Sequence, residues 1–178
     1  MAEDRFRRLA QKIEALRRKD ESNAARRTQI VRQRDAAARQ LHQICCRFAD
    51  RLNSHIKEDR VDLVPAEMPE EMDDECRQQI MLNVRGRVLL IALEAPSALV
   101  STDNFRKAYI LQGEVRFFNQ ELLDEALVEE HGLFFCPSEG PKDTQGHRQG
   151  AWLFWNGRNY KSGPVDEEYL AGLLEQLM

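Results

Sequence analysis

The chain has 178 residues, of which 42% are hydrophobic and 31% are charged, and its formal net charge is −4. This composition is too apolar for a disordered chain, and the longest uninterrupted apolar run, Val88–Leu93, is too short to cross a bilayer. The charged N-terminus indicates no secretory signal, and four cysteines without paired spacing favour a reducing compartment. We therefore expect a cytoplasmic protein that does not enter a membrane.

Charge and composition divide the chain near residue 60. Residues 1–60 carry 16 Lys and Arg against 9 Asp and Glu, whereas the remaining 118 residues carry 10 against 21. All nine glycines and all six prolines lie beyond residue 60, so the first segment has no helix breaker. We expect a basic helical or coiled-coil segment at residues 1–60, an acidic linker with prolines at 61–75, and an α+β domain at 76–178.

The N-terminal segment carries apolar side chains at the a and d positions of a seven-residue repeat, lettered a to g, in which Phe6 is an a position. A narrow apolar stripe on a charged helix has to be covered by another helix, which predicts a coiled coil or a helical hairpin. We expect the chain to form a homodimer through the apolar members of this stripe, which are Phe6, Leu9, Ile13, Leu16, Ile30, Leu41, Ile44 and Phe48.

Two arrangements of this segment fit the pattern. In the first, one helix runs from about Asp4 to Lys57 and pairs with a second chain, and Asp20 and Asn23 are buried polar residues that fix the register. In the second, the chain breaks at residues 20–23 and its two helices fold back on each other. No Gly or Pro marks a turn at this place, which favours the continuous helix and, with it, dimerisation.

Arginines occur around the whole circumference of the N-terminal helix rather than on one side of it. A helix that reads a DNA groove concentrates its basic residues on one face, and a helix that lies on a membrane has a broad apolar face. The pattern therefore favours a solvated coiled-coil surface. Nucleic-acid binding by the Arg-rich helix is the alternative, because a basic arm on an otherwise acidic chain is also typical of contact with a polyanion.

The pattern changes to short strands after residue 75. Ile80–Val84 and Arg87–Glu94 predict a hairpin with a glycine turn, and Val88–Leu93 reads as a strand covered on both faces. A second hairpin is expected to turn at Gly113, between Arg106–Gln112 and Glu114–Asn119. Its inward-facing side chains are expected to be Tyr109, Leu111, Val115 and Phe117.

The last third of the chain predicts two helices and a further hairpin. A helix containing Leu122, Leu123, Ala126 and Leu127 is expected to end at Gly132, followed by a short strand, Leu133–Cys136. Asn156-Gly157 predicts a tight hairpin turn. Asp166 is expected to cap a final helix, whose apolar stripe consists of Tyr169, Leu170, Leu173, Leu174 and Leu177. The whole pattern predicts an α+β fold, in which the long helix is followed by an antiparallel-sheet domain covered by two helices.

Catalytic and metal-binding patterns are weak. Cys136 lies near His131 and His147 in the sequence, as a thiol with a base requires, but it sits in an apolar run that favours a buried cysteine. The spacing matches no tetrahedral zinc site, and the glycines form no phosphate-binding loop. We therefore expect no enzymatic activity, no cofactor and no metal.

A possible partner surface lies after Pro137. The polar loop 138–150 carries basic side chains, and the following hairpin carries two tryptophans, of which one face could be exposed. The residues of this candidate surface are Lys142, His147, Arg148, Trp152 and Trp155. Taken together, these patterns predict a non-enzymatic interaction or scaffold protein. It would self-associate through its N-terminal helix and present an acidic α+β domain to a protein partner.

Overall fold

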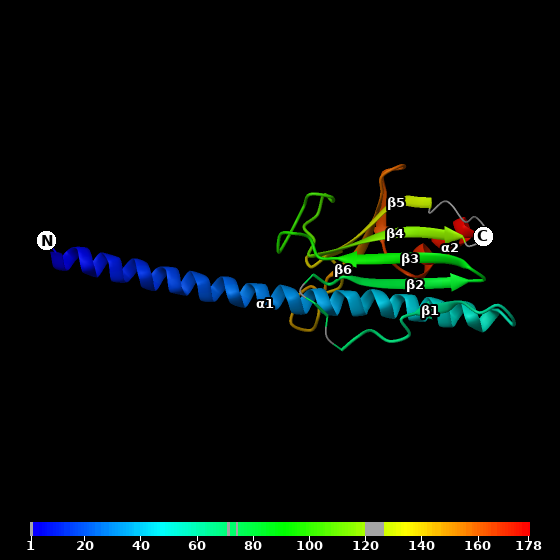
Figure 1. Ribbon diagram of the computed structural model, residues 1–178, viewed down its shortest axis with the longest axis horizontal. Coiled ribbons are helices and arrows are strands. Elements are labelled where there is room, and N and C mark those ends of the chain that lie inside the picture. The colour runs from blue at the N-terminus through cyan, green and yellow to red at the C-terminus, as the bar shows by residue number, and fades with distance from the viewer. Residues whose placement is uncertain (1, 71, 74, 120–126) are drawn as a thin grey trace. The chain divides into compact units, whose positions relative to one another are not determined.

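The computed structural model describes residues 2–70, 72–73, 75–119 and 127–178. The chain divides into two compact units, residues 1–33 and 34–178. In chain order the helices and strands (Figure 1) are α1 (Ala2–His55), β1 (Asp62–Val64), β2 (Gln78–Val84), β3 (Arg87–Glu94), β4 (Leu111–Asn119), β5 (Leu127–Cys136), β6 (Ala151–Asn156), β7 (Lys161–Pro164) and α2 (Glu167–Leu177).

The predicted α+β architecture is confirmed. A long N-terminal helix precedes an antiparallel sheet, and a second helix ends the chain. The described strands form one seven-stranded sheet in the order β1 to β7, and each strand pairs antiparallel with its neighbour in the sequence. Several of these strands lie side by side in Figure 1. Such a meander needs only short connections, which agrees with the closely spaced turn signals of the sequence.

Helix α1 has no break at Asp20–Asn23, so the continuous helix is confirmed and the fold-back arrangement is not adopted. The first unit, residues 1–33, consists of this helix alone, and its residues from Glu3 to Gln29 are all exposed. Residues 34–55 of the same helix belong to the second unit, together with the sheet.

One face of the sheet is apolar and forms the core of the second unit. Successive strand residues alternate between faces, and register pairs Ile80 with Ile91 and Ile91 with Val115. All three side chains are at most 1% exposed. On the same face, Trp152 Nε1 donates a hydrogen bond of 2.8 Å to the Ala37 carbonyl of α1. The helix residues buried there are Ala37, Ala38, Leu41, Ile44, Cys45, Phe48 and Ala49.

Helix α2 covers the same apolar face, where it lies against β3 and reaches β6 through Tyr169. Asp166 caps the helix as predicted, because its carboxylate accepts a hydrogen bond of 2.9 Å from the Tyr169 N–H. The Tyr169 ring stacks on Phe154 of β6 at 4.3 Å, and Phe154 lies two residues from Trp152, on the same side of the strand. The buried leucines of α2 are Leu170, Leu173 and Leu174. The sheet is therefore covered by residues 34–55 of α1 and by α2.

Arg34 joins the helix to the connection between β3 and β4. Its side chain is only 5% exposed, and its Nε donates a hydrogen bond of 2.7 Å to the Ile110 carbonyl. Its Nη2 donates to the carbonyls of Ala98 and Leu99, at 3.2 and 3.1 Å. A buried guanidinium is tolerated only when its donors are satisfied, so this connection is held close to the helix.

The predicted hairpin turns have mixed outcomes. The β2–β3 hairpin is confirmed with the expected strand β3, and its turn residues Arg85 and Gly86 have φ of 51° and 82°, which suits a tight hairpin. The β6–β7 hairpin is confirmed as well, but Asn156 pairs with Lys161, so its turn is longer than the predicted two residues.

Two predictions in the middle of the domain are wrong. Strand β4 runs through Gly113 without a turn. A Cβ on Gly113 would lie 3.0 Å from the Leu93 side chain, so this glycine serves close packing between neighbouring strands. The predicted inward side chains Tyr109, Leu111, Val115 and Phe117 are nevertheless all buried.

The helix predicted to end at Gly132 is also wrong from Leu127 onward, where the chain forms β5. The reason is tertiary, because β5 pairs with β4 on one side and β6 on the other, and this pairing overrides a local helical pattern. The predicted helix residues Leu122, Leu123 and Ala126 lie outside the described residues.

We predict that Leu41→Ala lowers the free energy of unfolding by about 2–5 kcal/mol, because Leu41 is fully buried in the second unit and its loss leaves a cavity. Leu16→Ala, at a side chain that is 58% exposed, is the matched control and should change the free energy of unfolding by less than about 0.5 kcal/mol. Urea unfolding of dilute protein measures this free energy for both variants. Equal losses in the two variants would contradict the burial of this part of α1.

Candidate functional site

The clearest unpartnered surface among the described residues lies on the first turns of α1. Phe6, Leu9, Ile13 and Leu16 are 72%, 52%, 57% and 58% exposed. Their spacing of three and four residues places them on one side of the helix. We call these four side chains the open seam. A row of large apolar side chains in water is typical of a surface that another element covers.

The other four predicted association residues are buried. Ile30, Leu41, Ile44 and Phe48 are 6%, 0%, 7% and 6% exposed. Three of them, Leu41, Ile44 and Phe48, lie in the second unit and form part of the helix surface over the sheet. These three residues are therefore used inside the chain, and the open seam is the part of the stripe that an additional helix can reach.

The loop 137–150 brings three of the predicted surface residues together. Lys142 and Arg148 face each other in an isolated antiparallel bridge, and Lys142, His147 and Arg148 are all exposed. Asp143 shapes the loop tip, because its Oδ1 accepts hydrogen bonds from the backbone N–H groups of Gln145 and His147 at 2.9 and 2.8 Å. The loop therefore presents two exposed basic side chains next to the carboxylate of Asp143.

The two predicted surface tryptophans lie on opposite faces of β6. Trp152 is 2% exposed and bonded to the Ala37 carbonyl, so it belongs to the core. Trp155 is partly exposed, and its ring meets that of Tyr160 edge-on at 5.9 Å. Of the pair, only Trp155 is available to a partner, together with Tyr160, which the sequence analysis did not single out.

The thiol and imidazole candidates are not brought together. Cys136 is fully buried, and its burial, with a smaller effect of Glu139, raises its pKa to about 11. The His131 ring is engaged elsewhere, with Nδ1 at 3.0 Å from the Tyr169 hydroxyl and Nε2 at 2.7 Å from Asn156 Nδ2. Because His131 and Cys136 are five residues apart on one strand, they point to opposite faces of the sheet.

Cys45 and Cys46 belong to the second unit as well. Cys45 is buried, and this burial, followed by the charge of Cys46, raises its pKa to about 12. Cys46 is partly exposed, with its sulfur 3.5 Å from His42 Nδ1. Its pKa is also raised, first by desolvation and then by Asp50. Neither thiol has the lowered pKa that a nucleophilic cysteine needs.

Two kinds of site are absent from the part of the chain that the structure describes. No cluster of three or more His, Cys, Asp or Glu side chains there has the geometry to hold a metal ion. No helix in the described ranges combines the length and the apolar character that crossing a membrane requires.

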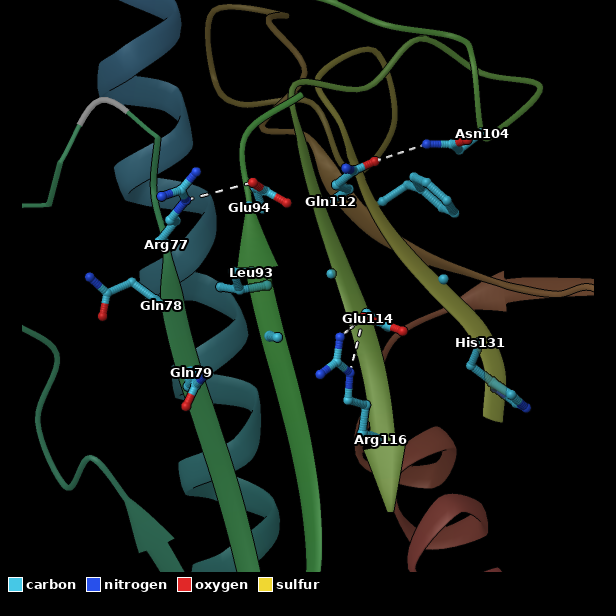
Figure 2. Close-up of a pocket in the computed structure, with 14 residues that line it drawn as sticks. Arg77, Gln78, Gln79, Leu93, Glu94, Asn104, Gln112, Glu114, Arg116 and His131 are labelled. Carbon is cyan, nitrogen blue, oxygen red and sulfur yellow. Dashed lines mark hydrogen bonds and ion pairs between the residues drawn. The ribbon is translucent and has the colours of Figure 1, made fainter. Parts of the chain in front are cut away.

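The open face of the sheet carries a polar groove of about 720 Å³ (Figure 2). Its side chains pair within the groove. Arg116 Nε lies 3.1 Å from Glu114 Oε2, and Arg77 Nε lies 3.6 Å from Glu94 Oε1. The hydrogen bond and charge of Glu114 raise the pKa of Arg116. One end of the groove reaches Phe134, which stacks on Phe105 at 4.7 Å.

Sequence analysis missed this groove for a definite reason. On β4, Gln112, Glu114 and Arg116 alternate with buried residues, and this period of two is a readable signal of a polar strand face. The expected turn at Gly113 divided that pattern. The pairing of Arg77 with Glu94 requires the register of β2 on β3, which the residues alone do not supply.

We predict that Cys136 and Cys45 resist alkylation in the native protein at neutral pH. A pKa of about 11 leaves only about one Cys136 thiol in ten thousand ionised at pH 7, and burial blocks access to it. Cys46, which is partly exposed, should react first. Mass spectrometry of peptides after iodoacetamide treatment measures the order, and the unfolded chain, in which all four thiols react, is the control. Preferential labelling of Cys136 in the native protein would contradict this assignment.

No protein-family model matches the sequence, no curated protein matches it, and no solved structure matches the fold. What the protein does therefore has to follow from the exposure, charge and chemistry of its own residues.

Proposed function

We propose that this protein is a non-enzymatic interaction or scaffold protein that self-associates through its N-terminal helix and offers its α+β unit to a protein partner. The observation that carries the proposal is the open seam, in which Phe6, Leu9, Ile13 and Leu16 are each more than half exposed on one side of α1. Burying each such side chain is worth about 1.5–3 kcal/mol relative to its exposed state. A second helix with a matching stripe is the simplest cover.

The charge of the second unit supports its role as the partner-facing part. Residues 34–178 carry 16 Lys and Arg against 25 Asp and Glu, a balance of −9. This negative charge attracts a basic protein over a long range, which raises its association rate, and it repels acidic proteins. The exposed features on this unit are the groove, the loop 137–150 and the Trp155–Tyr160 pair.

We predict that the full chain shows a molar mass that rises with concentration from 20.7 kDa toward twice that value. Ile13→Asp should hold it at the single-chain mass, because the substitution places a charge in the seam. Ala15→Asp is the matched control, since residue 15 is a c position away from the seam, and it should behave as the wild type. Sedimentation equilibrium makes the measurement. A wild-type mass of 20.7 kDa at every concentration would refute self-association.

Nucleic-acid binding is the second candidate, and the observation that favours it is the charge of the first unit. Residues 1–33 carry ten Lys and Arg against five Asp and Glu, and all ten basic side chains are exposed. Basic side chains that neutralise phosphates release counterions, so the affinity falls steeply as salt is added.

Salt separates the two candidates. If residues 1–33 bind a polyanion, a fluorescent duplex should bind at low salt and be released at moderate salt. Two helices that are both basic repel each other, and salt screens that repulsion, so self-association should hold or strengthen over the same range. Absence of duplex binding even at low salt would end the nucleic-acid candidate. Loss of the dimer on adding salt would count against the apolar seam.

A further inference from the structure

The flanks of the open seam carry one sign of charge. In the seven-residue frame that starts with Phe6 as an a position, the residues beside the seam occupy the e and g positions. From residue 3 to residue 19 these are Glu3, Arg5, Ala10, Lys12, Arg17 and Lys19. Four of the six are basic, and all six side chains are exposed. Arg17 also pairs with Glu21 at 3.2 Å on the same helix, but both groups stay more than half exposed.

These flanks oppose pairing with a parallel second copy. In a parallel coiled coil, each g residue faces the e residue five positions later on the partner. Lys12 would then face Arg17 of the second copy. Because the pair is symmetric, Arg17 would also face Lys12 of the second copy. Beyond Leu16 the stripe itself also opposes the arrangement, because Asp20 and Arg27 occupy a positions and each would meet its own copy.

An antiparallel second copy also meets charge repulsion at the flanks of the seam. With Phe6 opposite Leu16 and Leu9 opposite Ile13, the g positions face one another and so do the e positions. Lys12 would face its own copy, and Arg5 would face Lys19. Only Glu3 opposite Arg17 would attract. In the parallel arrangement two of the five charged flank residues repel the second copy, and in the antiparallel arrangement three do. In both directions the seam therefore favours contact while part of its basic flank opposes it.

We propose that the open seam is built for an acidic helix of another protein, with apolar residues at a and d and Glu or Asp at e and g. This rests on the proposed function only in that the seam pairs with another helix. Charge complementarity at e and g sets partner choice in coiled coils. An acidic partner would give each of the four basic flank residues an attractive contact, which a second copy gives at most one of them, and would displace the second copy. These residues are Arg5, Lys12, Arg17 and Lys19.

Two synthetic helices test the proposal against the full-length protein. Both carry Ile at a and Leu at d over four heptads, and they differ only in having Glu or Lys at every e and g position. By fluorescence anisotropy at low salt, the Glu peptide should bind at least about tenfold tighter than the Lys peptide, since the contacts of four basic flank residues become attractive and only that of Glu3 becomes repulsive. Added salt should narrow this ratio. Equal affinities at low salt would overturn the proposal.

A single variant should move two measurements in opposite directions. Lys12→Glu should weaken binding of the Glu peptide several-fold, and it should tighten parallel self-association because residue 12 would then face Arg17 of the second copy with opposite charge. Arg18→Glu makes the same change of charge at an f position, on the far side from the seam, and should move neither measurement by more than about twofold. An equal effect of the two variants would show that net charge, rather than the flank positions, governs binding.

The outcomes also separate this proposal from the proposed function. If Ile13→Asp abolishes self-association but the Glu and Lys peptides bind equally, the seam does pair with helices, and only the proposal that its partner is acidic is wrong. If neither peptide binds and the wild type stays at a single-chain mass, the seam does not pair helices and both proposals fail. Circular dichroism of each variant checks that the helix content is unchanged, so that a loss of binding reports the contact.

Discussion

The fold depends on residues 34–55 of α1 lying over the apolar face of the sheet. A seven-stranded antiparallel meander with one apolar face is stable in water only when that face is covered. The helix supplies this cover with small and large residues together, and Ala37 and Ala38 are fully buried. The hydrogen bond from Trp152 to the Ala37 carbonyl and the three carbonyl contacts of Arg34 fix where the helix lies.

The apolar stripe of α1 therefore has two differently placed parts. Its later part, which includes Leu41 and Phe48, is buried in the second unit, whereas Phe6 to Leu16 are exposed. The same spacing serves both, because an apolar stripe at a and d can be covered by a helix or by a sheet. The charges differ along the helix as well, since basic residues flank the open seam. The helix therefore packs within the second unit at one end and exposes an apolar stripe with basic flanks at the other, which is the basis of the function that we propose.

Local signals predicted the parts of the fold that local forces decide. The turn at Gly86 and the Asp166 cap were correctly predicted because positive φ and helix N–H groups demand particular residues. The turn at Gly113 and the helix through Leu127 were wrongly predicted because strand pairing on both sides decided those segments. The groove on the open face joins residues from β2 to β5, and its ion pair between Arg77 and Glu94 exists only through the strand register.

The sequence by itself determined the class of the fold, the helical character of the N-terminal segment and the apolar stripe along it, because helix propensity and the spacing of apolar residues act over a few turns of chain. Tertiary structure alone decided which part of that stripe is open, that Trp152 is a core residue while Trp155 is not, and that Cys136 and His131 lie on opposite faces. The physical reason is that burial is a property of surfaces brought together from distant parts of the chain, and a residue's neighbours in the sequence do not specify which surface will cover it.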